Sequence, residues 1–510
     1  MNLPDESHLI AHKKVVFLIP IFPVIFFFLH NISSFMELVL TKEVLILFII
    51  YSLFAIIIFL SVKFILRQSI QFAAIISSLV MLAFLFFGVL QDYLIQFKKN
   101  NILTNTYFLL FAGIIFIIIT SIFINRNPRR LKNTIRYFLL LYSLLTLFES
   151  SMICYKLMTG KSISAITSRM VSPINIKADS TIDKPDIYYI VFDGYTGPAT
   201  LREFWGFEND IYPYLNSKGF FTVDSGFSNY KSTPFSISSI LSLQYLTGSQ
   251  PYLYSNSSNF LVGQKVYAKN ILYDFLKQQH YDFSIYSQLE DKKMLTAFGF
   301  LGVDEPVNWL RKLTLERIYL DPWKLNKLRI FFGGKSDQKA VKLESMLKFD
   351  DYNKRAIAHI FTDCENSSTS KLNKPIFSFT HFMLPHDPYL RDELGNPVVS
   401  PEPGGMDMNG YLKQVKYSNQ LIKQITECLL GDTTRKKIII FQGDHGYRHY
   451  TNAPVNRQFE ALNAIYFYNH KYNNLRKNMS HVNTFRIVVN NIFGSNLPLL
   501  EDRFYLLKKE

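Results

Sequence analysis

Hydrophobic residues are concentrated in the first third of the chain, in runs that show neither helical nor strand alternation. A run of about twenty apolar residues is long enough to cross the hydrocarbon core of a bilayer as a helix. Such runs predict a transmembrane bundle over residues 1–160. We place its five spans near Val15 to Ile32, Val44 to Val62, Ile70 to Leu90, Tyr107 to Ile124 and Tyr137 to Cys154.

Basic residues flank these spans unevenly. Most lie before the first span, after the second and after the fourth, and cytoplasmic loops are the ones enriched in Lys and Arg. We therefore expect a cytoplasmic N-terminus and, after five spans, an extracytoplasmic remainder. Glu149 is the acidic residue within a span. It is a candidate for substrate handling, or it reaches lipid headgroups at the outer interface.

The pattern changes after the bundle. Residues 161–184 are polar and predict a linker, and residues 185–510 alternate apolar strands with helical patterns. This alternation is typical of an α/β domain with a mostly parallel sheet. Helices are expected at 211–218 and 269–279, each followed by a strand, at 219–223 and 281–286. Residues 289–348 are mixed, and we leave open whether they shape a substrate pocket or serve as scaffold.

Two of the predicted strands end in carboxylates. Asp444 and His445 follow the run Lys436 to Phe441, and Asp193 follows the run Ile187 to Phe192. Open α/β sheets place their sites at the carboxyl edge of the strands, so the three side chains can meet there. Oxygen and nitrogen ligands together suit zinc or manganese better than calcium. Taken singly, each of these residues is more often part of a turn or a helix cap.

Thr233 precedes a predicted helix whose apolar members Ile237, Ile240 and Leu241 recur at helical spacing. The N-terminus of a helix favours an anion because its N–H groups are free and its dipole is positive there. A threonine hydroxyl activated by a metal could act as a nucleophile toward a phosphate or sulfate ester. A helix cap without chemistry is the alternative.

Further polar residues could bind substrate. His386 follows another strand, at the turn His386-Asp387-Pro388-Tyr389, and could contact phosphate oxygens or protonate a leaving group. After the Asp-His pair, Arg448 could clamp an anion and His449 could act as a second acid, or both could be loop residues. Asn229, just before Thr233, is a further candidate substrate ligand.

Four motifs of this chain occur in the order found in the alkaline phosphatase superfamily. They are a strand followed by Asp, a Thr before a helix, the turn His-Asp-Pro-Tyr, and a strand followed by Asp-His-Gly. Together with the spans, the chain resembles the sulfatase-like membrane enzymes, such as lipoteichoic acid synthase and the phosphoethanolamine transferases. The resemblance implies an alkaline-phosphatase-like domain and one divalent ion, Mn or Zn with Mg possible. It assigns the ion to Asp193, Thr233, Asp444 and His445, and it favours His386 over His381 as a phosphate contact.

The sequence departs from the sulfatase pattern at two positions, and both limit the reaction that we expect. Sulfatases carry an oxidisable Cys or Ser in Cys-x-Pro-Ser-Arg, whereas this chain has Thr233-Pro234-Phe235-Ser236-Ile237. Threonine is a secondary alcohol and cannot form the aldehyde of sulfatases. Gly194 stands where sulfatases have a second aspartate, which fits a site with one metal ion.

The net charge bears on the binding partners that we expect, and the cysteines bear on possible disulfide pairing. The net charge of +15 divides into +7 for residues 1–160 and +8 for the rest, so the outer part should be drawn to anionic lipid headgroups. No basic stripe typical of nucleic-acid binding is present. Cys364 and Cys428 could pair outside the membrane, because Cys154 ends a span, but the sequence does not show that they do.

The favoured hypothesis is an enzyme that moves a phosphoethanolamine or phosphoglycerol headgroup from a membrane lipid to an envelope glycan or lipid, through a phospho-threonine at Thr233. One alternative is a hydrolase of sulfate or phosphate esters on the same scaffold. Another is a membrane scaffold that keeps the fold without turnover.

Overall fold

The computed structural model describes most of the chain. The described residues are 16–39, 41–97, 102–159, 170–179, 184–246, 263, 266–290, 306–320, 338–368, 373–398, 407–449 and 454–506. By contact they form two compact units. The bundle unit comprises residues 1–165 and 304–341, and the sheet unit comprises 166–303 and 342–510.

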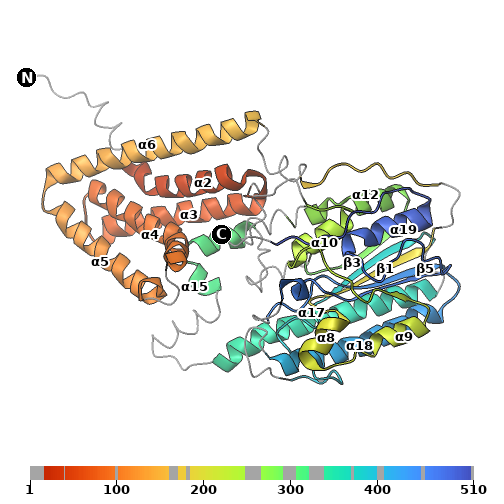
Figure 1. Ribbon diagram of the computed structural model, residues 1–510. Coiled ribbons are helices and arrows are strands. Elements are labelled where there is room, and N and C mark those ends of the chain that lie inside the picture. Colours follow the sequence, from red (N-terminus) through yellow and green to blue (C-terminus); the bar gives the residue numbers. More distant parts are fainter. Residues whose placement is uncertain are drawn as a thin grey trace, which may run out of the picture. The chain divides into compact units, whose positions relative to one another are not determined.

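The bundle unit contains five helices that are long and apolar enough to cross a membrane, among the residues described. Apolar side chains face outward along most of them, as they should where lipid replaces water. The prediction of five apolar N-terminal helices is confirmed. These helices are α2 (Phe22–Val39), α3 (Lys42–Leu60), α4 (Ile70–Phe97), α5 (Thr106–Asn125) and α6 (Pro128–Thr159) (Figure 1).

The bundle unit also includes a segment from much later in the chain, which the sequence analysis placed in the outer domain. Helix α14 (Pro306–Leu313) packs with α4, and α15 (Arg317–Leu320) packs with α14. Arg317 donates a 2.7 Å hydrogen bond to the Gly88 carbonyl and forms a 2.8 Å ion pair with Asp92. This packing could not be predicted from the mixed composition of the two helices. Their residues are not apolar enough for a transmembrane span, and they do not show the regular pattern of strands and helices in a sheet domain.

Within the bundle, Glu149 is buried. Its carboxylate bonds to the His30 ring at 2.8 Å and accepts from the Ser33 hydroxyl. These contacts join α6 to α2. Its predicted role in substrate handling stays a prediction.

The sheet unit is a six-stranded mixed sheet in the order β2-β6-β5-β1-β4-β3. The four strands β5, β1, β4 and β3 are parallel, and β6 is antiparallel to its neighbours β5 and β2. The α/β class with a mostly parallel sheet is thus confirmed. The strands are β1 (Asp186–Phe192), β2 (Phe221–Thr222), β3 (Asp282–Tyr286), β4 (Ile376–Phe382), β5 (Lys437–Gly443) and β6 (Asn463–Phe467).

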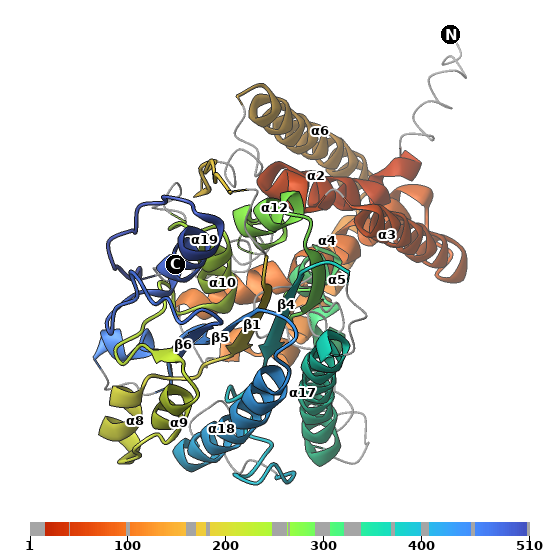
Figure 2. The same ribbon diagram turned by 90° about the vertical axis from the view of Figure 1, so that its right-hand side faces the viewer.

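Helices cover both faces of this sheet (Figures 1 and 2). A separate apolar core lies on each side. Alternate residues of β1 face opposite cores, with Tyr189 on one side and Tyr188 on the other. The first face carries α10 (Thr233–Leu241), α12 (Ile271–Gln278) and α19 (Thr484–Phe493). The second carries α8 (Pro198–Trp205), α9 (Ile211–Ser217), α17 (Gln338–Ser368) and α18 (Met408–Gly431).

A disulfide joins Cys364 of α17 to Cys428 of α18, across 64 residues of sequence. The sequence analysis had left this pairing open. Of the predicted linker 161–184, most lies outside the described residues, apart from residues 170–179 and Lys184.

Candidate active site and metal centre

The central strands bring three predicted site residues together. In the parallel register, Phe192 of β1 lies opposite Gly443 of β5. The next residues along each strand are Asp193 and Asp444, with His445 following. All three side chains are buried. The register of two neighbouring strands therefore places two carboxylates and an imidazole at one point of the sheet edge.

Three atoms of these side chains converge without hydrogen-bond partners. The Nε2 atom of His445 lies 3.4 Å from Oδ1 of Asp193 and 3.5 Å from Oδ2 of Asp444. None of the three atoms has a partner in the described structure. Buried polar atoms are rarely left unpaired, and ligand atoms of the three residues lie within 4.8 Å of one another. One nitrogen and two oxygens so arranged fit a divalent cation.

The remaining polar atoms of these ligands are held by neighbours. Oδ1 of Asp444 accepts hydrogen bonds of 2.9 Å from the backbone N–H groups of Gly194 and His445. Nδ1 of His445 lies 2.9 Å from the Gly446 carbonyl, to which it donates. Because the proton of the neutral ring is on Nδ1, Nε2 carries the lone pair that can bind a cation. Such outer contacts fix the orientation of metal ligands.

The electrostatics of the cluster also favour a cation. Burial, followed by the nearby Asp444 carboxylate, raises the pKa of Asp193 to about 7. Burial, followed by the positive charge of Arg448, lowers the pKa of His445 to about 3. Two carboxylates in a buried space repel each other, and a neutral imidazole offers its lone pair. A bound cation would offset that repulsion.

Two glycines allow the turns that carry the ligands. Gly194 has φ +70°, in the left-handed region, where a side chain would be strained. At Gly446, a Cβ atom would lie 2.4 Å from the Glu460 carbonyl oxygen. The Asp-His-Gly sequence thus needs its glycine because another backbone segment passes too close for a side chain.

Thr233 is the first residue of α10 and is buried beside the cluster. Its Oγ1 lies 3.5 Å from Oδ2 of Asp193. One turn later, the Ser236 hydroxyl donates a 2.5 Å hydrogen bond to the Asp444 carbonyl, which ties this helix to the β5 turn. The structure therefore brings Thr233 next to the cluster of Asp193, Asp444 and His445, and its role as a nucleophile stays a prediction.

The loops after β4 and β5 supply a second group of polar residues. Arg448 donates a 2.9 Å hydrogen bond to Nε2 of His386, and Nδ1 of His386 donates to the Asp387 carbonyl at 2.6 Å. His449 lies 3.1 Å from the Asp387 carboxylate. Together with Gly194 and His445, these residues line a small cavity at the cluster. Three predicted substrate ligands, His386, Arg448 and His449, thus meet beside the candidate metal cluster of Asp193, Asp444 and His445.

Asn229 is placed differently. Its side-chain amide donates to the Arg503 carbonyl at 2.6 Å, and its side-chain oxygen accepts from the Val482 N–H at 2.9 Å. Both ends of the amide thus hold the C-terminal segment. A substrate-binding role for Asn229 stays a prediction.

Sequence reasoning missed Gln288 and Asp387 and set His381 aside in favour of His386. Gln288 donates a 2.9 Å hydrogen bond to Oδ2 of Asp193, and Nε2 of His381 lies 3.8 Å from the same oxygen. Asp387 holds His386 and His449. Gln288 follows β3 closely, so the strand-end rule applied to Asp193 could have found it. Asp387 was visible in the motif but was treated as part of a turn.

The sulfatase family model matches residues 203–492, more than half of the chain, and the chain therefore belongs to the sulfatase family. The resemblance to sulfatase-like proteins of the alkaline phosphatase superfamily is thereby confirmed. No curated protein matches the chain in sequence.

Several solved structures are similar at low identity. One is the soluble domain of lipooligosaccharide phosphoethanolamine transferase A from Neisseria meningitidis, with 14% identity over 62% of this chain and 90% of that chain, at a TM-score of 0.37. Another is the C-terminal periplasmic domain of phosphoethanolamine transferase EptC from Campylobacter jejuni, with 14% identity over 64% and 95%, at 0.35. A third is the C-terminal periplasmic domain of EcEptC from Escherichia coli in complex with Zn, with 12% identity over 64% and 87%, at 0.35. We base the functional proposal on the residues of the site itself.

Proposed function

We propose that this protein is a metal-dependent transferase. It moves a phosphoethanolamine or phosphoglycerol headgroup from a membrane lipid to a hydroxyl of an envelope glycan or lipid. The observation that carries this proposal is the position of Thr233. Its hydroxyl lies at the N-terminus of a helix, 3.5 Å from a carboxylate of the Asp193, Asp444 and His445 cluster.

The residues suggest two steps. In the first, the Thr233 hydroxyl gives up its proton and Oγ1 attacks the phosphorus of the lipid phosphodiester. The bond from phosphorus to the diacylglycerol oxygen breaks, and that oxygen takes a proton. In the second, the acceptor hydroxyl gives up its proton and attacks the phosphorus of the phospho-threonine, the bond from phosphorus to Oγ1 breaks, and Oγ1 takes a proton. Splitting the transfer in this way is the usual advantage of a covalent intermediate.

The cation belongs on Asp193, Asp444 and His445, with Thr233 beside them, and Mn or Zn suits this donor set, with Mg possible. When bound, such an ion supplies positive charge that favours the deprotonated threonine hydroxyl and balances the charge of the phosphate.

His386 and Arg448 are suited to hold the phosphate oxygens. Burial lowers the pKa of His386, but the negative charges of Asp193 and Asp387 outweigh burial and raise it overall. A protonated His386 cannot accept from Arg448, so both side chains become donors toward an anion between them. Donors fixed in place before the reaction are the main source of transition-state stabilisation in such sites.

The cellular setting follows from the rest of the chain. Five apolar helices would hold the enzyme in the membrane that contains its lipid donor. The Cys364–Cys428 disulfide fits an oxidising, extracytoplasmic compartment for the sheet unit. With a cytoplasmic N-terminus, as the basic loops favour, the sheet unit lies on the outer side, beside the envelope acceptor.

The proposal is tested with the full-length protein in nanodiscs, stripped with EDTA and reloaded with Mn or Zn. Phosphatidylethanolamine and phosphatidylglycerol with fluorescent acyl chains serve as donors, and release of fluorescent diacylglycerol is the readout. We expect release that requires metal, and a loss of at least about 10³-fold in Thr233→Ala. Thr233→Ser keeps a hydroxyl and should retain measurable activity.

Thr426→Ala is the matched control, because Thr426 is also buried but its hydroxyl bonds only to a carbonyl of its own helix, that of Ile422. It should keep full activity. Release of sulfate from an aryl sulfate, without diacylglycerol release, would favour the hydrolase alternative. Absence of turnover with every metal and donor would favour a membrane scaffold.

A further inference from the structure

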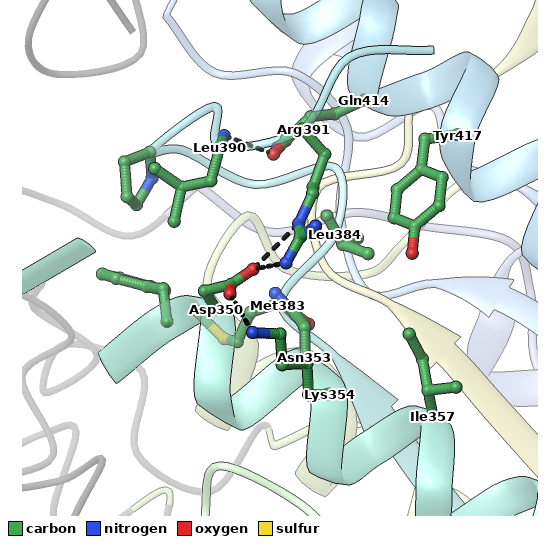
Figure 3. A pocket seen from close by; sticks show the side chains of 12 residues that line it. Asp350, Asn353, Lys354, Ile357, Met383, Leu384, Leu390, Arg391, Gln414 and Tyr417 are labelled. Carbon is green, nitrogen blue, oxygen red and sulfur yellow. Dashed lines mark hydrogen bonds and ion pairs between the residues drawn. The ribbon is translucent and has the colours of Figure 1, made fainter. Parts of the chain in front are cut away.

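A second cavity, of about 130 Å³, lies in the sheet unit (Figure 3). Its walls come from three segments: one side of α17, the loop that follows β4, and one side of α18. Neither the metal cluster nor Thr233 lines it. It is distinct from the small cavity at the cluster, yet the same loop borders both.

That loop presents alternate residues to the two cavities. His386, Asp387 and Tyr389 line the cavity at the metal cluster, whereas Pro388 and Leu390 line the second. A group bound in the second cavity would therefore contact the loop that carries His386. The two cavities therefore lie on the two sides of one loop.

Gln414 of α18 holds this loop in shape. Its amide nitrogen donates to the carbonyls of Pro385, at 3.2 Å, and His386, at 3.1 Å, and its oxygen accepts from the Leu390 N–H at 2.7 Å. Because Gln414 is buried and also lines the second cavity, it links that cavity directly to the backbone of His386.

The polar wall of the second cavity carries an excess of positive charge. Arg391 donates to the Asp350 carboxylate through Nε, at 2.8 Å, and through a terminal nitrogen, and to the Gly395 carbonyl at 2.7 Å. Lys354 pairs with the same carboxylate at 2.8 Å. Two cations thus share one anion. Arg391 is held on every nitrogen, whereas the Lys354 side chain is 65% exposed and can turn to another anion.

The other walls are apolar or aromatic. Phe349, Ile357, Met383 and Leu384 line the cavity, and the Tyr417 hydroxyl points into the opening above Ile357 in this view (Figure 3). A sugar ring has C–H faces that pack on apolar side chains and hydroxyl groups that bond to polar ones. A mainly apolar pocket with a few placed polar groups selects such a mixed ligand. The excess positive charge adds a preference for an acidic substituent.

We propose that this cavity binds the acceptor of the transfer reaction, as a sugar ring that carries a negatively charged group. Lys354 recognises the charge, and Phe349, Ile357 and Leu384 contact the ring. The ring would then lie against the loop that carries His386, which borders both cavities. The identification of the bound sugar as the acceptor rests on the proposed function, but binding of the sugar itself does not require turnover.

Binding is measured by isothermal titration of the full-length, metal-free protein with D-glucuronate, D-glucose and acetate. A carboxylate probe without metal avoids capture of phosphate by the cluster. We expect saturable binding of glucuronate, at least tenfold tighter than that of glucose or acetate. Lys354→Met should abolish the preference for glucuronate over glucose. Ile357→Trp fills the cavity and should weaken glucuronate binding at least tenfold.

Ala358→Trp is the matched control, because Ala358 is the next residue of α17 but is exposed and does not line the cavity. It should bind glucuronate as the unchanged protein does. Equal binding in Ile357→Trp, or no saturable binding at about 10 mM glucuronate, would overturn the inference.

The two proposals fail in different ways. A protein that binds glucuronate in an Ile357-dependent manner but releases no diacylglycerol from any lipid contradicts the proposed function alone. A protein that transfers headgroups but shows no such binding contradicts the acceptor subsite alone. In an active protein, Ile357→Trp should raise the KM for an acidic glycan acceptor at least tenfold and leave the KM for the lipid donor unchanged.

Discussion

The bridge between Cys364 and Cys428 should contribute about 4 kcal/mol to the stability of the sheet unit. This value follows from the 64-residue separation of the two cysteines, because closing a loop of that length removes conformational entropy from the unfolded chain. The loop contains β4 and the segment with His386. Loss of the bridge should therefore destabilise the part of the sheet unit that carries the phosphate contacts.

The assay is thermal unfolding of the full-length protein in detergent, followed by intrinsic fluorescence. The double variant Cys364→Ala/Cys428→Ala should unfold at a temperature lower by on the order of 10 °C, since a domain of this size shifts by about 2–4 °C per kcal/mol. Reduction of the unchanged protein should produce a similar shift, and reduction of the double variant should produce none. Cys154→Ala is the control, because Cys154 is a free, exposed cysteine. A shift below about 2 °C, or an equal shift in the control, would refute the reasoning.

Three further predictions concern the site and the bundle. Asp444→Asn keeps an oxygen for its backbone donors but loses the charge, so the metal retained after dialysis, measured by plasma mass spectrometry, should fall at least tenfold; unchanged retention would place the metal elsewhere. Gly446→Ala puts a Cβ atom 2.4 Å from a backbone oxygen and should cost about 1–3 kcal/mol in thermal unfolding. Gly431→Ala, with open space around its Cβ position, should not, and equal losses in both would contradict this explanation. Gly88→Ala would meet the Lys312 carbonyl oxygen at 2.3 Å, so limited proteolysis should cut residues 306–320 faster than in Gly113→Ala, which meets nothing; equal rates would mean that this packing is not required.

Much of the architecture could be predicted because the signals were strong and local. A span needs about twenty apolar residues in one stretch, and five such stretches were visible. The strands β1 and β5 are buried along their whole length, so each read as a continuous apolar run that ends in a carboxylate. Their common direction placed Asp193 and Asp444 at one edge. The helices around 211–218 and 269–279 were found for a similar reason, as α9 and α12.

The rest could not be predicted because it depends on contacts between distant segments. Residues 306–320 pack in the bundle unit through backbone contacts at Gly88, which composition does not encode. Gln414 lies within α18, 28 residues after His386, and nothing in its neighbours distinguishes it from other helix residues. The second cavity is formed by α17, the loop after β4, and α18. Only their packing brings Asp350 and Arg391 together.

The covalent phospho-threonine proposed at Thr233 can be detected by peptide mass spectrometry of the metal-loaded protein, quenched in acid soon after mixing with donor lipid. We predict a phosphoethanolamine or phosphoglycerol adduct on Thr233 that is absent in Thr233→Ala and disappears when the acceptor is added. Turnover of the lipid with no adduct on Thr233, or with an adduct on another residue, would contradict the account.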